Sequence, residues 1–299
     1  FDFNAGFGCE VEVVEAKGGA LLQRIQNEGE ACPADVLITV DAGNLGLVDA
    51  AGLFQPVKSA AIEAAVPAQY RHANGNWVGY GIRSRVMVYN PKTVKVEDLP
   101  NSDIDLIDDK WRGRIAIRSS SNMYNQSLLA SIIAAHGPEK ARQWAAGMVQ
   151  NFARQPQGND RAQIKAVAAG EADIAVVNHY YVAKMIHSDD AEQTAAVAKV
   201  ALHFPGQSDQ SGAHANISGA GILKHAQETA EAQAFLEFLA SPEGQQLFIQ
   251  PSFEYPVVTG VTVDYPMFPA DFIAAPVSAE KFAELNRDAV MIFDQVQWR

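Results

Sequence analysis

Two adjacent tyrosines, Tyr180 and Tyr181, place two phenol oxygens side by side directly after a short apolar run. The run, Ile-Ala-Val-Val at residues 174–177, predicts a strand that is buried on both faces, as in a parallel sheet. Ligand sites in open α/β sheets lie outside the carboxyl ends of the strands, which is where this run places the two phenols. Alternatively, the pair belongs to the edge of the core and keeps its hydroxyls in water. The local sequence leaves both interpretations open.

A second polar segment stands before another apolar stretch. Ser119, Ser120, Ser121 and Asn122 come just before the apolar residues 128–135, which predict a helix. Serine and asparagine side chains cap helix N-termini, and the free backbone N–H groups of a helix start also attract anions. Capping alone and anion binding both remain open for this segment.

Composition limits the classes of partner. The chain has 299 residues, a formal net charge of −12 and an isoelectric point near 5.0. A chain of this length is expected to form two globular lobes. The negative charge argues against a nucleic-acid partner and against an anionic membrane surface, and it is compatible with a cationic ligand. No window approaches the roughly 18 uninterrupted apolar residues of a membrane-spanning helix.

Cys9 and Cys32 each stand just before a predicted strand, at residues 11–14 and 36–40. If these strands are parallel neighbours, their starts lie close together and a disulfide is geometrically feasible, which would suit an exported protein. Two unpaired buried thiols are the alternative. The sequence shows no signal peptide, so a mature exported protein and a cytosolic protein both fit.

Strands and helices alternate along the first part of the chain. Acidic and apolar side chains alternate over residues 10–15 and predict a strand, and residues 35–40 predict a second, buried strand. Helices are predicted around residues 21–25 and 47–51. This β-α-β-α order predicts a parallel sheet.

Two later strands are candidates for connections between the lobes. The apolar residues 86–90 predict a long strand that leaves the first lobe, and residues 214–222 predict a strand that returns to it. The lobes expected from these crossovers are residues 1–87 with 219–299, and residues 88–218.

Several long motifs occur together along the chain. They are Ala-Asp-Val-Leu-Ile-Thr-Val-Asp-Ala-Gly at 34–43, Arg-Ser-Arg-Val at 83–86, Arg-Ser-Ser-Ser-Asn-Met-Tyr-Asn-Gln-Ser at 118–127, Asn-His-Tyr-Tyr at 178–181 and His-Ala-Asn-Ile-Ser-Gly-Ala-Gly at 214–221. In this order and spacing, the chain from about Glu10 to Trp298 resembles the ferric iron-binding periplasmic proteins of ABC transporters, and most closely their cyanobacterial-type, tyrosine-rich branch. The resemblance implies the α/β, two-lobed fold of type II periplasmic binding proteins, in which two crossover strands form a hinge.

The resemblance implies that Tyr124, Tyr180 and Tyr181 bind ferric iron as three phenolate ligands from the second lobe. Ferric iron is a hard, highly charged cation, and such cations prefer anionic oxygen donors. A free phenol has a pKa of about 10, so these side chains lose their protons at neutral pH only when a metal displaces them. Three phenolates would neutralise the ion, and acid would favour its release.

The same resemblance places polar side chains around the phenolates. Arg83 and Arg85 are expected to hold the phenolate oxygens or a small anion such as carbonate. Ser119 and Asn122 are expected to contact the anion. Alternatively, the two arginines have a purely structural or surface role.

The chain departs from the family pattern in the first lobe. Family members carry a His or His-Tyr segment after a first strand, whereas this sequence begins in what would be the first helix. A carboxylate ligand used by another branch would fall at Val40. We therefore expect either an upstream segment that is missing here or a site completed by water or a small anion. His179 adjoins the tyrosine pair, and we expect it to point away from the metal, because neighbours on an extended segment alternate faces.

Together these observations predict an extracytoplasmic protein that captures ferric iron between its lobes and delivers it to an ABC permease. We expect a periplasmic monomer, tethered to the membrane if a lipoprotein signal has been removed. The same fold with a small anion or an organic solute as cargo is an alternative. An enzyme on a hinged scaffold is a further alternative, but the sequence contains no Gly-x-Ser-x-Gly elbow, His-Glu-x-x-His motif or phosphate-binding loop.

Overall fold

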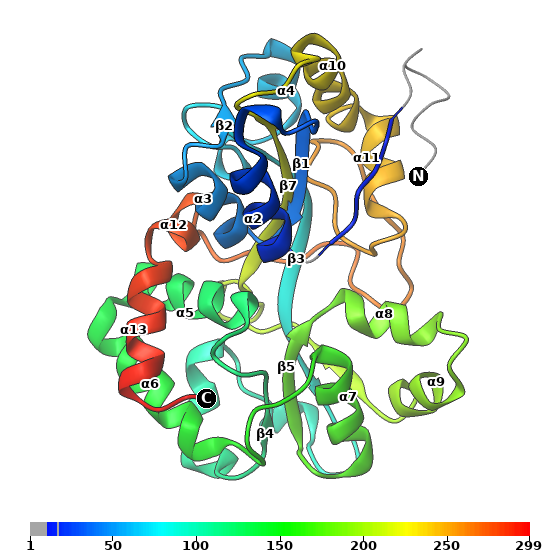
Figure 1. The fold of residues 1–299 in the computed structure, drawn as a ribbon. Coiled ribbons are helices and arrows are strands. Elements are labelled where there is room, and N and C mark those ends of the chain that lie inside the picture. The colour runs from blue at the N-terminus through cyan, green and yellow to red at the C-terminus, as the bar shows by residue number, and fades with distance from the viewer. Residues whose placement is uncertain (1–10, 17) are drawn as a thin grey trace. The chain divides into compact units, whose positions relative to one another are not determined.

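The chain divides into two compact units that share two strands. In this computed structural model, the described residues are 11–16 and 18–299. Unit 1 contains the described residues up to Ile82 with Ile217–Val263 and Ser278–Ala283, and unit 2 contains Arg83–Asn216, Asp264–Val277 and Glu284–Arg299. Strands β3 (Val78–Tyr89) and β7 (Ala215–Leu223) each begin in one unit and end in the other (Figure 1).

Unit 1 is built on antiparallel pairing with β7. Strand β1 (Val36–Val40) pairs with β7 along its whole length, with Val36 opposite Ile222, and β2 (Phe54–Gln55) pairs with the end of the same strand. The helical elements of this unit are α2 (Gly18–Glu28), α3 (Ala42–Ala50), α4 (Ala60–Ala65), α10 (Thr229–Leu239), α11 (Pro242–Ile249), most of α12 (Ala279–Glu284), and 3₁₀ turns at Gly29–Ala31 and Ala68–Tyr70.

The prediction of a strand at residues 10–15 is wrong for residues 11–15, which are the part of it that the structure describes. Residues 11–16 adopt no regular secondary structure, and Val13 and Val14 are 66% and 60% exposed. A strand needs a neighbour for its backbone hydrogen bonds, which alternation of side chains does not provide. Cys9, the predicted disulfide partner of Cys32, lies outside the described residues, whereas Cys32 is a buried free thiol.

Unit 2 contains a mixed sheet in which β5 (Ile174–Asn178) lies between β3 and β4 (Ile115–Ala116). Strand β4 is parallel to β5, whereas β3 is antiparallel both to β5 and to β6 (Ala201–His203). The predicted buried strand is confirmed, because every residue of β5 is buried, but the sheet is not purely parallel. Strand β3 reaches this sheet as the continuation of a strand of unit 1 and not through a crossover helix, so parallel pairing is not required of it.

The helices of unit 2 follow the apolar stretches of the sequence. They are α5 (Met123–His136), α6 (Pro138–Asn151), α7 (Asp160–Ala169), α8 (Tyr180–Ile186), α9 (Ala191–Val197) and α13 (Asn286–Gln295), with 3₁₀ turns at Val96–Asp98, Asp103–Ile107 and Asp109–Trp111. No helix in the described part of the chain has the length and apolar character needed to cross a membrane.

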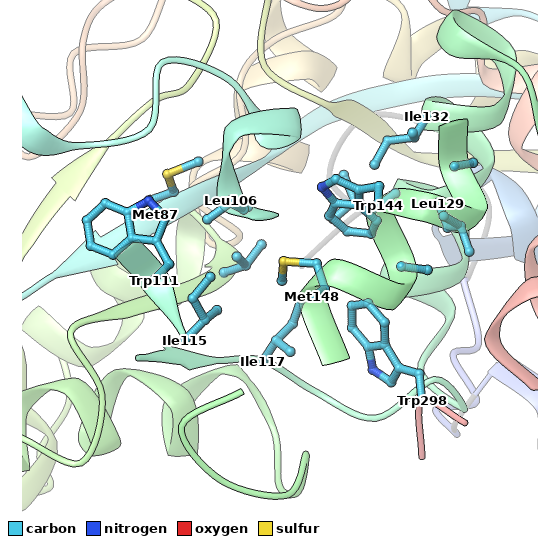
Figure 2. Packing of buried hydrophobic residues seen from close by; sticks show 14 of the residues in the cluster. Met87, Leu106, Trp111, Ile115, Ile117, Leu129, Ile132, Trp144, Met148 and Trp298 are labelled. Carbon is cyan, nitrogen blue, oxygen red and sulfur yellow. The ribbon is translucent and has the colours of Figure 1, made fainter. Parts of the chain in front are cut away.

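Helices α5, α6 and α13 pack against one another around a large apolar core. Trp144 of α6 and Trp298, just beyond α13, both lie in this core (Figure 2), with their ring centroids 5.9 Å apart. Trp298 also packs against Phe152 and Phe293, at centroid distances of 4.9 and 4.8 Å. Its indole N–H donates a hydrogen bond to the carbonyl oxygen of Arg118 at 3.2 Å.

This packing places the C-terminal residues in unit 2. From the sequence we expect the whole of 219–299 in the first lobe, whereas Asp264–Val277 and Glu284–Arg299 lie in unit 2. The contacts of α13 with α5 and α6 hold Glu284–Arg299 in unit 2. The segment Asp264–Val277 is held there by backbone hydrogen bonds to Ala213, which accepts from Ala275 at 2.9 Å and donates to Ile273 at 2.8 Å. The sequence around α13 does not specify these partners, because they are distant along the chain.

Replacing Trp298 by Ala is expected to lower the free energy of unfolding by about 3–5 kcal/mol, the usual loss when a large aromatic side chain is removed from a packed core. Urea unfolding followed by circular dichroism measures the loss. Met291→Ala is the matched control, because Met291 lies on α13 and is 49% exposed. The control should change the free energy by less than about 0.5 kcal/mol, and equal losses in the two variants would contradict the packing described.

Candidate functional site

Tyr180 and Tyr181 begin helix α8, directly beyond the carboxyl end of β5. Strand β5 ends at Asn178, and His179 already has helical backbone angles, with φ −55° and ψ −42°. Tyr180 is 5% exposed and Tyr181 is half-buried, and their ring centroids are 4.5 Å apart. The pair therefore lies just past a strand end, as the sequence predicts, but on the first turn of a helix.

Tyr124 brings a third phenol from the first turn of α5. The Tyr180 hydroxyl donates a hydrogen bond to the Tyr124 hydroxyl at 3.3 Å. Asn178 Nδ2 donates to the Tyr180 hydroxyl at 3.4 Å. One hydrogen bond and one ring contact therefore join the three phenol side chains into a single cluster within unit 2.

The ring of His179 is fixed by contacts other than the phenol hydroxyls. It is fully buried, and its Nδ1 accepts a hydrogen bond from the backbone N–H of Ser84 at 3.1 Å. The ring packs edge-on against Phe268, at a centroid distance of 4.9 Å, and edge-on against Tyr180 at 5.9 Å. We expect alternation along an extended segment to turn His179 away, but the segment is helical here, and the hydrogen bond from Ser84 orients the ring instead.

Two guanidinium groups face the ring of Tyr124. The Cζ atoms of Arg83 and Arg118 lie 5.1 and 5.3 Å from the centroid of that ring. Positive charge over the face of a phenol is attracted by the ring electrons. Arg83, which the resemblance places beside phenolate oxygens or an anion, thus faces the ring of Tyr124, and Arg118 joins it.

Two further cations lie against the tyrosine pair, and the sequence analysis does not single them out. Arg161 Cζ is 5.2 Å from the ring centroid of Tyr181, and Lys184 Nζ is 5.1 Å from that of Tyr180. Helical spacing is the only sequence signal for Lys184, which follows Tyr180 by one turn of α8. Arg161 has no such signal, because α7 approaches the pair only in the folded chain.

Arg85 takes part in a buried hydrogen-bond network. Its guanidinium donates to Asp160 Oδ1 at 2.8 Å, to Asn125 Oδ1 at 3.0 Å and to the carbonyl oxygen of Val176 at 3.0 Å. The side chain of Arg85 is 1% exposed and that of Asp160 is fully buried. Of the two predicted arginines, Arg83 therefore faces a phenol ring, whereas Arg85 connects the segments that carry the phenols.

The predicted anion contacts lie at the N-terminus of α5. Ser119 Oγ is hydrogen-bonded to Ser121 Oγ at 2.8 Å, and the carbonyl oxygen of Ser119 accepts from Asn125 Nδ2 at 3.2 Å. Asn122 is the N-cap residue of α5 but makes no side-chain capping hydrogen bond. Its Oδ1 is buried without a hydrogen-bond partner. The side chain of Asn122 therefore does not serve the helix start and remains available to a ligand.

Burial keeps the phenols of Tyr180 and Tyr181 protonated in the metal-free protein. It raises the pKa of Tyr180 well above the ordinary value of 10.0, an effect to which the neighbouring Tyr124 adds and which Arg83 opposes. Burial likewise raises the pKa of Tyr181 to about 12, and Arg118 is among the groups that lower it. Ionisation of these phenols at neutral pH therefore requires a metal to take the place of the proton.

Carboxylate, imidazole and thiol ligands do not gather elsewhere in the described structure. Across residues 11–16 and 18–299, no group of three or more His, Cys, Asp and Glu side chains could hold a metal ion. Val40, where one branch of the resembled family would place a carboxylate, ends β1 and is 41% exposed. The clustered phenols are a candidate donor set for a hard metal ion, because such ions prefer oxygen ligands.

Comparisons with known proteins match most of the chain. The family model for bacterial extracellular solute-binding proteins matches residues 32–272. The chain is 42% identical over 298 residues to iron uptake protein A1 of a Synechocystis species, a match that covers 99% of this chain and 82% of the relative. It is 31% identical over 297 residues to the Fe(3+)-binding periplasmic protein of Serratia marcescens, covering 97% of this chain and 85% of the relative.

Solved structures show the same fold. Trichodesmium IdiA (FutA), in complex with iron and citrate ligands, matches with a TM-score of 0.95 and 44% identity, covering 99% of this chain and 94% of that one. These matches confirm the predicted α/β, two-lobed periplasmic binding protein fold and the resemblance to ferric iron-binding proteins. The family consists of binding proteins and not of enzymes. The family model matches residues 32–272, and 99% of this chain aligns with a relative at 42% identity. The chain therefore belongs to the bacterial extracellular solute-binding proteins.

Proposed function

We propose that this chain is an extracytoplasmic solute-binding protein whose cargo is ferric iron, bound by the phenolates of Tyr124, Tyr180 and Tyr181. The observation that carries the proposal is the clustering of the three phenol side chains. The hydroxyl of Tyr180 lies 3.3 Å from that of Tyr124, and the ring of Tyr181 packs against that of Tyr180 at a centroid distance of 4.5 Å. Phenols gathered in this way can supply oxygens to one small, highly charged cation, which prefers anionic oxygen donors.

Charge balance supports a ferric cargo. Three phenolates neutralise Fe³⁺, so the bound unit adds no net charge to a largely buried place. The charge of Arg83 lowers the pKa of Tyr180 and that of Arg118 lowers the pKa of Tyr181, so both arginines partly offset the effect of burial on these phenols. Each phenol must lose its proton to bind the metal, so capture of iron releases protons and acid favours release of the metal.

Relatives support both iron and a companion anion. Two relatives are an iron uptake protein and an Fe(3+)-binding periplasmic protein, and the Trichodesmium structure holds iron and citrate. We infer that a small anion such as carbonate or a carboxylate completes the coordination of the metal. Arg118 Nε supports this inference, because this N–H donor is buried without a hydrogen-bond partner and its guanidinium lies over the ring of Tyr124.

Membership of the family supports delivery of the cargo to an ABC permease. A relative from Sinorhizobium fredii, 27% identical over 79% of this chain, is a probable ABC transporter periplasmic-binding protein. We place this protein in the periplasm, where a lipid anchor would tether it if a lipoprotein signal has been removed. A monomer suffices for the site, because one chain supplies all three phenols.

An organic or inorganic anion without iron is a second candidate cargo. Arg118 and Arg161 each carry a buried Nε atom without a hydrogen-bond partner, and both guanidinium groups lie against phenol rings of the site. An oxyanion held by these groups would leave the phenols protonated. The two candidates therefore differ in whether a phenolate forms.

Ferric loading is expected to give an orange-red phenolate-to-iron charge-transfer band, which Tyr180→Phe or Tyr181→Phe weakens or removes. Each substitution deletes one donor oxygen and leaves the aromatic packing in place. Iron affinity should fall at least about ten-fold in either variant, measured by absorption titration against a competing chelator. Tyr80→Phe is the matched control, because Tyr80 is a buried tyrosine of unit 1 whose hydroxyl donates to the Leu236 carbonyl oxygen at 2.9 Å.

Two outcomes of this experiment would count against the proposed cargo. A protein that stays colourless after ferric loading, and that binds citrate or carbonate tightly by calorimetry, would favour the anion alone. A coloured complex of unchanged affinity in both phenylalanine variants would place the iron elsewhere.

The metal-free protein is expected to lose stability as the pH rises from about 10 to about 12. Burial raises the pKa of Tyr181 to about 12 in the folded chain, whereas a phenol in the unfolded chain ionises near its ordinary value of about 10. Between these values the unfolded chain binds fewer protons than the folded chain, so the free energy of unfolding falls with rising pH. Below this window both states are protonated and the contribution is fully present.

Urea unfolding of the metal-free chain at several pH values across the window measures this fall. Tyr181→Phe should show a smaller fall than the parent chain, because it removes one of the groups responsible. Equal pH dependence in the two proteins would show that the Tyr181 phenol is not held in its neutral form.

A further inference from the structure

Asp160, the first residue of α7, is fully buried and uses both of its carboxylate oxygens. Oδ1 accepts hydrogen bonds from Arg85 Nη1 at 2.8 Å and from the backbone N–H of Asn178 at 2.9 Å. Oδ2 accepts from Arg118 Nη1 at 2.7 Å. The three donors belong to β3, to the end of β5 and to the loop before α5, so one side chain joins three segments that are separate in sequence.

Two of these segments lead directly into the phenols. Asn178 stands just before the tyrosine pair, and its Nδ2 donates to the Tyr180 hydroxyl at 3.4 Å. On the other side, the carbonyl oxygen of Arg118 accepts from Asn125 Nδ2 at 2.7 Å, and Asn125 follows Tyr124 on α5. The hydrogen bonds of Asp160 therefore begin a short path to each tyrosine-bearing segment.

The two arginines complete the link from Asp160 to Tyr124. Arg85 Nη2 donates to Asn125 Oδ1 at 3.0 Å, which ties the start of α5 to the network. The guanidinium of Arg118 lies over the Tyr124 ring, with Cζ 5.3 Å from its centroid. Asp160 thus holds both the backbone that carries this phenol and a cation that faces it.

The carboxylate of Asp160 does not stabilise phenolates by its charge. Burial is the main cause of the raised pKa of Tyr180 and of Tyr181, and the negative charge of Asp160 raises both further. A buried carboxylate between two guanidinium groups also costs desolvation energy and contributes little net stability. Its hydrogen bonds to three segments give it a geometric role instead.

We propose that Asp160 is the positioning residue of the phenol group: its carboxylate holds the start of α5 and the end of β5 so that their tyrosines meet at one metal ion. The inference rests on the proposed function, since it concerns the same site. Asp160 does not touch the phenol hydroxyls and acts through Arg85, Arg118 and the backbone of Asn178.

The test is the affinity of Asp160→Asn for iron supplied as ferric citrate, measured against a competing chelator by the charge-transfer band. Asparagine has nearly the same shape but carries no charge and cannot accept hydrogen bonds at both terminal atoms. Loss of positioning predicts at least about ten-fold weaker binding, as is typical when a group that orients a metal ligand is removed. It also predicts a shifted absorption maximum for the iron that does bind. If only the charge of Asp160 mattered, Asp160→Asn would bind iron more tightly, because removing a negative charge beside the phenols favours their ionisation.

Asp173→Asn is the matched control. Asp173 pairs with Arg114 and accepts a hydrogen bond from Thr93 at the other end of β5, away from the tyrosines. Its removal breaks a charged pair next to the same strand and should leave both the affinity and the absorption maximum unchanged. Circular dichroism and urea unfolding show whether each variant is folded.

Arg118→Lys provides a second, independent test if Asp160→Asn does not fold. Lysine keeps the charge but lacks the planar fork with which Arg118 both pairs with Asp160 and covers the Tyr124 ring. Weaker iron binding in this variant supports the proposal, and unchanged binding overturns it. The proposal is also overturned if the parent chain shows the charge-transfer band and a folded Asp160→Asn protein binds iron as tightly as the parent chain or more tightly. If the parent chain shows no charge-transfer band, the proposed function fails and this inference fails with it.

Discussion

The close packing of three phenol side chains is the constraint on which the site depends. The Tyr180 hydroxyl lies 3.3 Å from that of Tyr124, and the Tyr180 ring packs against Tyr181, in a place where burial raises the pKa of Tyr180 and of Tyr181. Such a group resists ionisation, because each phenolate would be poorly solvated and would repel its neighbours. A highly charged cation removes that obstacle, since it supplies the positive charge that three phenolates share. Under the proposed function, the phenols of Tyr180 and Tyr181 are therefore neutral at rest and become phenolates only when the cargo arrives.

The fold of unit 2 brings the phenols together at the starts of two helices. Helix α8 begins directly after β5, and α5 begins after the loop that follows β4, the parallel neighbour of β5. Carboxyl ends of parallel neighbours lie at the same edge of a sheet, where ligand sites of α/β folds form. The core reaches this edge through Trp298, whose indole N–H donates to the Arg118 carbonyl oxygen. The packing of α13 and the geometry of the site are thus connected through one loop.

Residues adjacent in the chain predict strand β5 and the position of two phenols at its end, whereas only the resemblance to a family adds Tyr124 and the role of a metal ligand. The apolar run of β5 and the two tyrosines after it form one such local pattern. The helical start at His179 is not predicted, since the hydrogen bond from Ser84 that holds its ring joins segments distant in sequence. Asp160 and Arg161 are not predicted for the same reason, because a single charged residue in a helical stretch carries no motif. Local patterns therefore predict elements and donor types, whereas the network that orients the donors arises only from tertiary contacts.

Anomalous diffraction from crystals of the iron-loaded chain tests the central claim most directly. The account predicts a single iron peak within coordination distance of the hydroxyl oxygens of Tyr124, Tyr180 and Tyr181, with the hydrogen bond between Tyr180 and Tyr124 replaced by bonds to the metal. An iron peak at another place, or phenols that remain hydrogen-bonded to one another in the loaded protein, would contradict it.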